Sequence, residues 1–247
     1  MIVVNGPIVS VGFGEDYFST TPPVIASMLA RTHETIHVDL AASSPDLEDM
    51  VDRIHEAVDS VATRGISPAI LGYGLGSCAA LMFAARNPGA SRCLALVAGW
   101  VRPPAKMLEL ASLWQTAERA GSGGAWWGVR SAELVMKQAE NWDAPSQTAN
   151  IPLLASVLGH CGTVDLDGLL DHVETPTLVV GCARDEFATL AQSRLLFGGI
   201  ENARYVEIDA GHAVLGERPF ELLNHLERFM GFPAEFPPGS VLVPEPA

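Results

Sequence analysis

Positive charge is scarce in this chain of 247 residues. Fifteen lysines and arginines, of which only Lys106 and Lys137 are lysines, stand against 29 aspartates and glutamates, and the formal net charge is −14. Binding to nucleic acid or to an anionic membrane requires a basic face, because both partners present negative charge. The charge balance therefore argues against nucleic-acid and membrane partners, and it leaves the oligomeric state open.

Cysteine is also sparse, and its spacing shows no pairing. The four cysteines lie among apolar or small residues, and no two of them have C-x-x-C spacing (Cys78, Cys93, Cys161 and Cys182). This usage is typical of reduced core thiols in a cytosolic protein and disfavours a zinc site. We therefore expect a cytoplasmic protein without a metal site. We also predict that it uses no other cofactor.

Long hydrophobic runs are missing as well. No apolar run reaches the roughly 18 residues that a membrane-spanning helix needs. The N-terminus carries no basic segment ahead of an apolar one, which is the pattern of a signal peptide. Neither a transmembrane helix nor a signal peptide is expected.

The most informative absence is a single hydroxyl group. Residues 69–81 read as a buried strand, a glycine-rich turn and a helix of small residues. This is the context of the G-x-S-x-G motif, in which a tight turn lifts a nucleophilic serine above a sheet. Here the motif reads Gly72-Tyr73-Gly74-Leu75-Gly76. The turn is predicted to form, because glycine adopts strained backbone angles readily, but residue 74 has no side chain.

Alternating strand and helix patterns fill most of the chain and predict a mostly parallel sheet with helices on both faces. The clearest amphipathic helix covers residues 46–64. Further helices are predicted over residues 187–197 and 217–230, and the proline-rich residues 233–247 are expected to be a surface tail. Besides the strand before the glycine-rich turn, the predicted strands cover residues 1–4, 8–11, 35–39, 93–98, 177–182 and 204–209, with a hairpin-like break at Asn5-Gly6-Pro7 between the first two.

Residues 101–172 lose this alternation and read as all helical. We predict that they form a helical cap on a core made of residues 1–100 and 173–247. Four of the five tryptophans lie within this segment and the fifth, Trp100, stands at its base. The tryptophans either pack a small core of the cap or line an apolar substrate pocket. The candidate pocket residues are Tyr73, Trp100, Trp126, Trp127 and His160.

Two later loops follow predicted strands and carry an acid and a base. The first ends in Asp185, and the second reads Asp-Ala-Gly-His and ends in His212. A histidine that acts as a base needs a fixed tautomer and a group that stabilises the imidazolium, and a neighbouring carboxylate supplies both. Asp185 and His212 are the candidates for such a pair. Alternatively, Asp185 caps the helix predicted to begin at Phe187, and His212 is a capping or core histidine.

The order of turn, acid and histidine along the chain resembles that of the α/β-hydrolase superfamily. It is most similar to compact members that carry a helical cap between the sixth and seventh core strands, and the resemblance spans Ile8 to Met230. It implies an α/β-hydrolase fold, with Gly74 at the nucleophile position and His212 and Asp185 as catalytic residues. It also implies an oxyanion hole formed by the backbone N–H groups of Phe13 and Leu75.

Without a serine at residue 74, an acyl-enzyme cannot form there. The remaining groups suit non-covalent acid–base chemistry on a carbonyl-containing small molecule, such as epimerisation, elimination or cyclisation of an intermediate of secondary metabolism. A hydrolase of esters, thioesters or lactones that uses water activated by His212 is the alternative. A binding protein without turnover, and an ordinary serine hydrolase engineered from serine to glycine, also remain open. Ser77 and Cys78 are expected to point away from the site.

Overall fold

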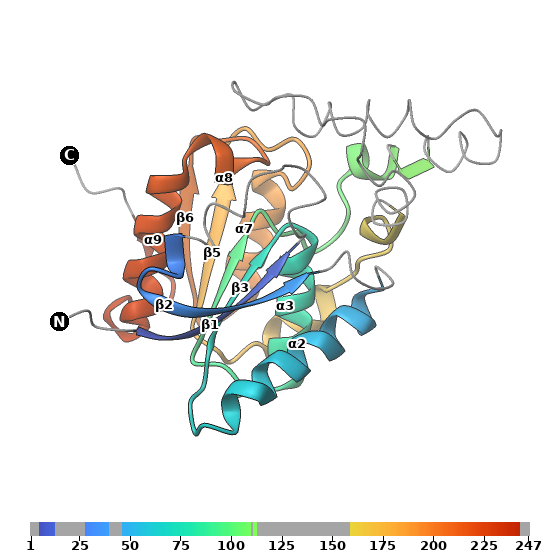
Figure 1. Ribbon diagram of the computed structural model, residues 1–247. Helices are drawn as coiled ribbons and strands as arrows, with labels where there is room; N and C mark the ends of the chain where they lie inside the picture. Colours follow the sequence, from blue (N-terminus) through green and yellow to red (C-terminus); the bar gives the residue numbers. More distant parts are fainter. Residues whose placement is uncertain (1–4, 13–27, 40–45, 110, 113–158, 243–247) are drawn as a thin grey trace, which may run out of the picture.

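The computed structural model describes residues 5–12, 28–39, 46–109, 111–112 and 159–242, which form a central sheet with helices on both faces (Figure 1). The strands are β1 (Asn5–Gly12), β2 (His33–Asp39), β3 (Ala69–Tyr73), β4 (Cys93–Val97), β5 (Thr177–Cys182), β6 (Ala203–Ile208) and β7 (Val241–Leu242). The helices are α2 (Leu47–Ala62), α3 (Leu75–Arg86), α7 (Leu190–Gly199), α8 (Val214–Glu217) and α9 (Pro219–Gly231), with the short 3₁₀ helices η2 (Asp167–His172) and η3 (Pro233–Glu235).

The strand order explains where a site can form. The sheet runs β2-β1-β3-β4-β5-β6-β7, and every neighbouring pair in this order is parallel. The carboxyl ends of parallel strands meet at one edge of a sheet, which is where ligands bind in open α/β folds. The loops after β3, β5 and β6 carry the predicted glycine, acid and histidine. These three loops therefore lie at the same edge of the sheet, the one formed by the carboxyl ends of the strands.

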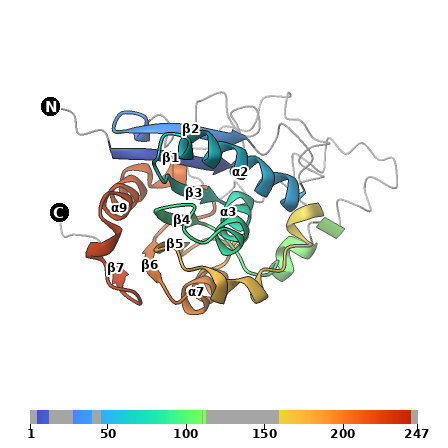
Figure 2. The ribbon, with the colours of Figure 1, turned by 90° about the horizontal axis from the view of Figure 1, so that it is seen from below.

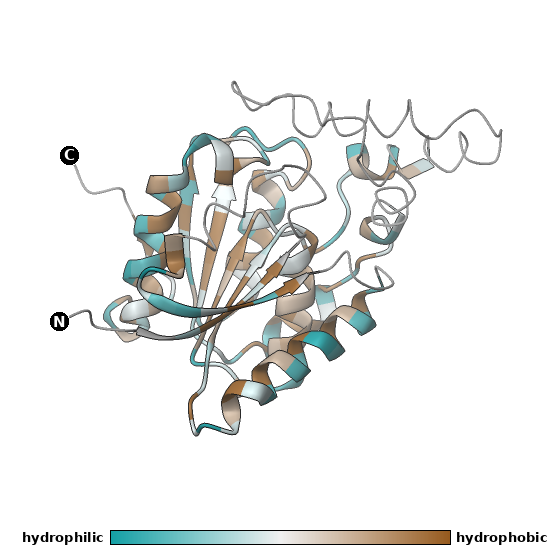
Figure 3. Cartoon of the chain, viewed as in Figure 1, coloured by the Kyte–Doolittle hydropathy of each residue, from teal (hydrophilic) through white to brown (hydrophobic). Residues whose placement is uncertain are grey.

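Helices cover both faces of the sheet, with α2 and α3 on one side and α9 on the other (Figure 2). All residues of β4 and β5 are buried. Such continuous apolar strands are expected when a parallel sheet is covered on both faces. Figure 3 shows the same division, with hydrophobic strands inside and hydrophilic outer helix faces.

The amphipathic helix predicted over residues 46–64 is confirmed as α2. Its N-cap is Asp46, whose carboxylate accepts a hydrogen bond from the backbone N–H of Glu48 at 3.1 Å. An aspartate at this position satisfies an amide that has no partner within the helix. The stripe that α2 buries consists of Met50, Val51, Ile54, Val58 and Val61.

Two boundaries predicted from the sequence are wrong. The predicted break at Asn5-Gly6-Pro7 is instead the start of β1, and its register against β2 shifts between Asn5 and Ile8. Pro7 has no N–H to donate, and such an irregularity tolerates it. The expected first strand, residues 1–4, lies outside the described residues. The helix predicted from residue 187 begins only at Leu190.

The proline-rich C-terminal segment holds more structure than a surface tail. Its residues Val241–Leu242 form β7, which pairs in parallel with β6 at the edge of the sheet. The backbone N–H of Gly239 donates to the carbonyl of Ala203 at 2.8 Å. Gly239 has φ +78°, a conformation that favours glycine. A turn at this glycine therefore leads the chain onto the sheet.

The segment predicted to be a cap leaves the sheet after β4 and returns at β5. Residues 105–109 and 159–161 are helical, and η2 follows before β5. The central part of the segment, residues 113–158, lies outside the described residues, so the helical cap and the domain division stay predictions. Within the described ranges, no helix is both long and apolar enough to cross a membrane.

Candidate active site

Gly74 forms the turn between β3 and α3. Its backbone adopts φ 57° and ψ −123°, a conformation that residues with a side chain rarely adopt. The Gly74 N–H donates to the carbonyl of Val97 at 2.9 Å, which ties the turn to β4. A β-carbon at residue 74 would lie 3.6 Å from Nε2 and 3.8 Å from Cε1 of His212, and outside residues 73–75 no other described atom lies within 4 Å of it. Residue 74 therefore faces the imidazole.

The glycines and the serine around this turn explain why it forms. A β-carbon at Gly72 would lie 2.5 Å from the carbonyl oxygen of Gly76, so only glycine allows the strand and helix to approach this closely. The Ser77 hydroxyl is buried and lies 2.8 Å from the carbonyl oxygens of both Gly72 and Val97. Ser77 thus holds the turn together and is directed at the backbone.

Cys78 is likewise directed into the backbone of the core. Its thiol is buried and donates to the carbonyl of Trp100 at 3.4 Å. Burial raises the pKa of Cys78 to about 12, and the thiolate is the nucleophilic form of cysteine. The Ser77 hydroxyl is bonded to two backbone carbonyls, and the Cys78 thiol stays protonated at neutral pH. Neither residue therefore replaces a nucleophile at residue 74.

Asp185 and His212 meet at the carboxyl edge of the sheet. Nδ1 of His212 lies 2.8 Å from Oδ2 of Asp185, and the Asp185 side chain is completely buried. Oδ1 accepts hydrogen bonds from the backbone N–H groups of Phe187 at 2.7 Å and Ala188 at 2.8 Å. Asp185 therefore holds the histidine and also caps the turn that follows it, whereas the helix that it was alternatively predicted to cap begins only at Leu190.

The charge state of this pair fixes the tautomer of the ring. Burial opposes ionisation of Asp185, but His212 and the two backbone N–H groups together hold the pKa of this carboxyl below its ordinary value. An ionised carboxylate only accepts hydrogen bonds, so Nδ1 of His212 must carry a hydrogen. In the neutral ring, Nε2 then has the free lone pair, and it faces Gly74.

The backbone N–H of Leu75, the predicted oxyanion donor, directly follows Gly74 in the chain. Leu75 is the first residue of α3, so its backbone N–H has no acceptor within the helix. The N-terminal end of a helix also favours nearby negative charge. Phe13, the second predicted oxyanion donor, lies outside the described residues, as do Trp126 and Trp127.

Aromatic rings surround His212. The ring centroids of Tyr73 and Phe187 lie 5.6 Å and 5.3 Å from the imidazole centroid. Trp100 packs edge-on against Phe187 at 6.3 Å. Phe187 was not predicted as a site residue, because the tight turn capped by Asp185 is what brings it back over the histidine. The only signal in the sequence is its position two residues after the acid.

Trp100 reaches this cluster through a strained turn. Ala98 has φ 49°, the only positive φ of a non-glycine residue in the described part of the chain. A β-carbon at Gly99 would lie 2.7 Å from Cβ of Ser77. Strain of this kind costs of order 1–3 kcal/mol and often occurs at functional sites. The turn sets the buried indole of Trp100 beside the His212 cluster.

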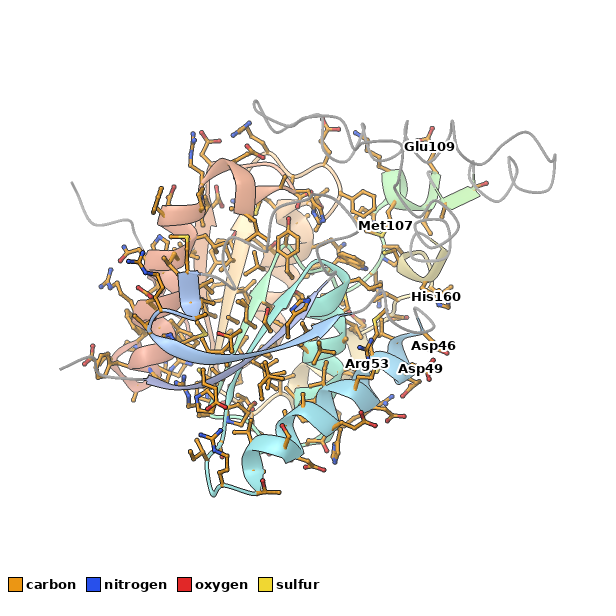
Figure 4. The ribbon with its side chains drawn as sticks, in the orientation of Figure 1. Asp46, Asp49, Arg53, Met107, Glu109 and His160 are labelled. Carbon is orange, nitrogen blue, oxygen red and sulfur yellow. The ribbon has the colours of Figure 1, made fainter. Side chains whose placement is uncertain are left out.

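His160 lies elsewhere. Figure 4 shows it beside Asp46 at the N-terminal end of α2. It lines a pocket of about 250 Å³ together with Asp46 and Met82, and neither Gly74 nor His212 lines that pocket. The structure thus groups Tyr73 and Trp100 with the histidine but not His160. Across the described ranges, no cluster of histidine, cysteine and carboxylate side chains could hold a metal ion.

Comparisons with known proteins agree with this fold. The chain is 28% identical over 206 residues to the pimeloyl-[acyl-carrier protein] methyl ester esterase of Neisseria meningitidis, a match covering 75% of this chain and 76% of that protein. It is 27% identical over 90 residues to the pyrrolizixenacetamide deacetylase of Xenorhabdus hominickii, where the match covers 36% of this chain and only 30% of the deacetylase.

Among solved structures, the enol-lactonase from Burkholderia xenovorans LB400 has a TM-score of 0.68 and 19% identity, with 92% of each chain covered. At this identity the likeness concerns the fold. The family model described as "Alpha/beta hydrolase family" matches residues 1–226. With this match over most of its length, the chain belongs to the alpha/beta hydrolase family.

Proposed function

We propose that this protein hydrolyses a carboxylic ester, thioester or lactone by activating a water molecule with His212. The observation that carries the proposal is the opposition of His212 and Gly74. Nδ1 of the ring is held at 2.8 Å by the buried Asp185, and Nε2 lies 3.6 Å from the position of a β-carbon on residue 74. A general base must be within hydrogen-bond reach of the proton it removes, and the space over Gly74 provides that reach for water.

The reaction balances without a covalent enzyme intermediate. Nε2 of His212 takes a proton from water as the water oxygen bonds to the carbonyl carbon. The carbonyl oxygen becomes an oxyanion and accepts a hydrogen bond from the Leu75 N–H. As the intermediate collapses, the bond to the leaving group breaks and Nε2 returns the proton to it. The products are a carboxylic acid and an alcohol or thiol, or the open hydroxy acid when the substrate is a lactone.

The size of these effects supports useful rates with activated substrates. General-base assistance typically contributes about 10²–10⁴-fold. A single oxyanion donor contributes about 10²–10³-fold. Asp185 assists by holding the ring in one tautomer and by stabilising the imidazolium that forms during the reaction. These contributions do not depend on a side chain at residue 74.

The relatives support hydrolysis over the non-hydrolytic chemistry that the sequence favoured. One relative matched over three quarters of this chain is named a methyl ester esterase, and another, matched over a shorter stretch, is named a deacetylase. A family relationship raises the expectation of related chemistry, although a fold by itself does not determine function. We therefore place the water-activating hydrolase first.

A second candidate function is proton abstraction at a carbon next to a carbonyl, which leads to epimerisation, elimination or cyclisation. The observation that favours it is the absence of a side chain at Gly74, because a substrate carbon can then approach Nε2 of His212 directly. The Leu75 N–H would hold the enolate oxygen in place of the tetrahedral oxyanion. The same base therefore serves both reactions.

Isotope labelling separates the two candidates. The purified protein is incubated in ¹⁸O-water with a panel of p-nitrophenyl esters, acyl thioesters and lactones. The ¹⁸O content of the products is then measured by mass spectrometry. Hydrolysis incorporates one ¹⁸O atom into each new carboxyl group. Turnover of a carbonyl substrate without ¹⁸O would reject hydrolysis in favour of the second candidate. Binding of the panel without any turnover would reject both.

A further inference from the structure

Glu217 is hydrogen-bonded to the loop that carries His212. It is the last residue of α8, and its side chain is only 7% exposed. One carboxylate oxygen accepts a hydrogen bond from the backbone N–H of Gly211 at 3.0 Å, and the other lies 2.9 Å from Nη2 of Arg184. The carboxylate therefore fixes the backbone of Gly211, the residue immediately before His212.

Arg184 connects this carboxylate to the loop that carries the acid. It directly precedes Asp185, and its backbone N–H donates to the carbonyl of Ala210 at 2.8 Å. Its guanidinium donates to a carboxylate oxygen of Asp209 at 2.8 Å and to the backbone carbonyl of Asp209 at 3.2 Å. The loop after β5 and the loop after β6 are thus joined by backbone and side-chain bonds.

The backbone of His212 is held from a second direction by Tyr73. The Tyr73 hydroxyl donates a hydrogen bond to the carbonyl oxygen of His212. Burial raises the pKa of Tyr73 well above its ordinary value, and the nearby Cys182, Asp185 and Glu217 raise it further. Tyr73 therefore keeps its proton and remains a donor.

An almost buried carboxylate is costly unless it is paired and hydrogen-bonded. Glu217 meets both conditions, and its two partners belong to the two loops whose relative position sets the Asp185–His212 distance. A general base acts only at hydrogen-bond distance from the proton that it removes. A displacement of about 1 Å at a reacting group can cost about 10²-fold in rate. Loss of the bonds that Glu217 makes to the two loops would therefore lower kcat more than it would change KM.

We propose that Glu217 is a positioning residue for His212, acting through the Gly211 N–H and through Arg184. This role in turnover rests on the proposed hydrolysis. The geometric part of the proposal, that Glu217 keeps the hydrogen bond between His212 and Asp185 in place, does not depend on the proposed hydrolysis. Glu217 removes no proton itself, because its carboxylate contacts the backbone and Arg184 while Asp185 contacts the ring.

The test compares Glu217→Ala and Glu217→Gln with the wild type. Alanine removes both bonds, whereas glutamine keeps an oxygen for the Gly211 N–H and loses the charge. The matched control is Glu207→Ala, because Glu207 also pairs with an arginine, Arg194, at 3.2 Å but lies on β6 away from the histidine. Each variant is measured for kcat, KM and thermal unfolding, and for the ¹H NMR signal of the His212 Nδ1–H bonded to Asp185.

We expect Glu217→Ala to lower kcat by about 10- to 100-fold with little change in KM, and to weaken or abolish the NMR signal. Glu217→Gln should recover part of both, and Glu207→Ala should keep both. If the alanine variant fails to fold, the glutamine variant and Arg184→Gln carry the test. A folded Glu217 variant with wild-type kcat and an unchanged signal overturns the proposal.

The NMR signal also separates this inference from the proposed function. It requires no substrate, so it reports the geometry even if the wild type hydrolyses nothing. Loss of the signal in Glu217→Ala supports positioning whether or not hydrolysis is found. An unchanged signal together with a kcat loss equal to that of Glu207→Ala means only general destabilisation, and rejects positioning.

Discussion

His212 lies opposite Gly74, with Nε2 of the ring 3.6 Å from the place where a β-carbon on residue 74 would be. The other ring nitrogen is bonded to the buried Asp185 at 2.8 Å. This geometry orients the imidazole toward a position that has no side chain.

Replacing His212 by alanine removes the proposed base. We expect turnover to fall by about 10²–10⁴-fold, the usual contribution of a general base, while the fold is retained because the ring lies at the edge of the sheet. His172→Ala is the matched control, since the His172 side chain is 63% exposed and outside the site. Steady-state kinetics of both variants provides the measurement. Wild-type kcat in His212→Ala would remove the base from the mechanism.

Replacing Gly74 by serine should create a reactive nucleophile. A serine oxygen extends beyond the β-carbon position that lies 3.6 Å from Nε2, so His212 can accept its proton. The variant should react with a fluorophosphonate probe, whereas the wild type should not. Both Gly74→Ser and the control Gly74→Ala adopt a positive φ, which costs about 1–3 kcal/mol of stability. Equal labelling of the serine and alanine variants would show that the imidazole does not reach residue 74.

The turn itself depends on Gly72. A β-carbon there would lie 2.5 Å from a backbone oxygen of Gly76, so Gly72→Ala must push β3 and α3 apart and should cost about 1–3 kcal/mol. Gly198 in α7 has nothing within 4 Å of a β-carbon. Gly198→Ala should therefore stabilise the protein by up to about 1 kcal/mol. Urea unfolding measures both changes, and similar midpoints for the two variants would contradict this account of the turn.

Asp185 should make stability depend on acid pH. The folded protein lowers the pKa of this carboxyl below the ordinary value of 3.8. The unfolded chain therefore binds the proton first as the pH falls. The stabilisation by Asp185 is complete above the ordinary pKa and is lost as the pH falls through the lower folded value. Unfolding free energies of wild type and Asp185→Asn across this window measure the effect. A wild-type loss no steeper than that of the asparagine variant would be inconsistent with an ionised, hydrogen-bonded Asp185.

The sequence predicted the elements whose signals are local. Helix α2 follows from an apolar stripe and the capping residue Asp46, and β5 follows from a continuous run of apolar residues. The glycines at residues 72 and 74 indicated the turn after β3, because few other residues tolerate its geometry. The pairing of Asp185 with His212 was predicted from the resemblance of their two loops to the acid and histidine loops of the α/β-hydrolase superfamily, and both loops follow strands of a parallel sheet.

The features that were missed depend on contacts between distant residues. The strand β7 pairs with β6 at the edge of the sheet, and the apolar run Val241-Leu242-Val243 is too short to predict a strand by itself. The hydrogen bond between Glu217 and the Gly211 N–H is local in sequence. The same carboxylate also pairs with Arg184, which comes from another loop, and local sequence does not indicate that contact. Phe187 reaches His212 through the turn that Asp185 caps. The composition of the chain and the periodicity of its apolar residues do not predict such contacts.

The most direct test is a crystal structure with a phosphonate monoester, a stable mimic of the tetrahedral intermediate formed by water attack. We predict that one phosphonate oxygen lies over Gly74 within hydrogen-bond distance of Nε2 of His212, and that another accepts the Leu75 N–H. The ring should keep its bond to Asp185. A phosphonate bound without contact to His212, or an imidazole rotated away from Gly74, would contradict the account.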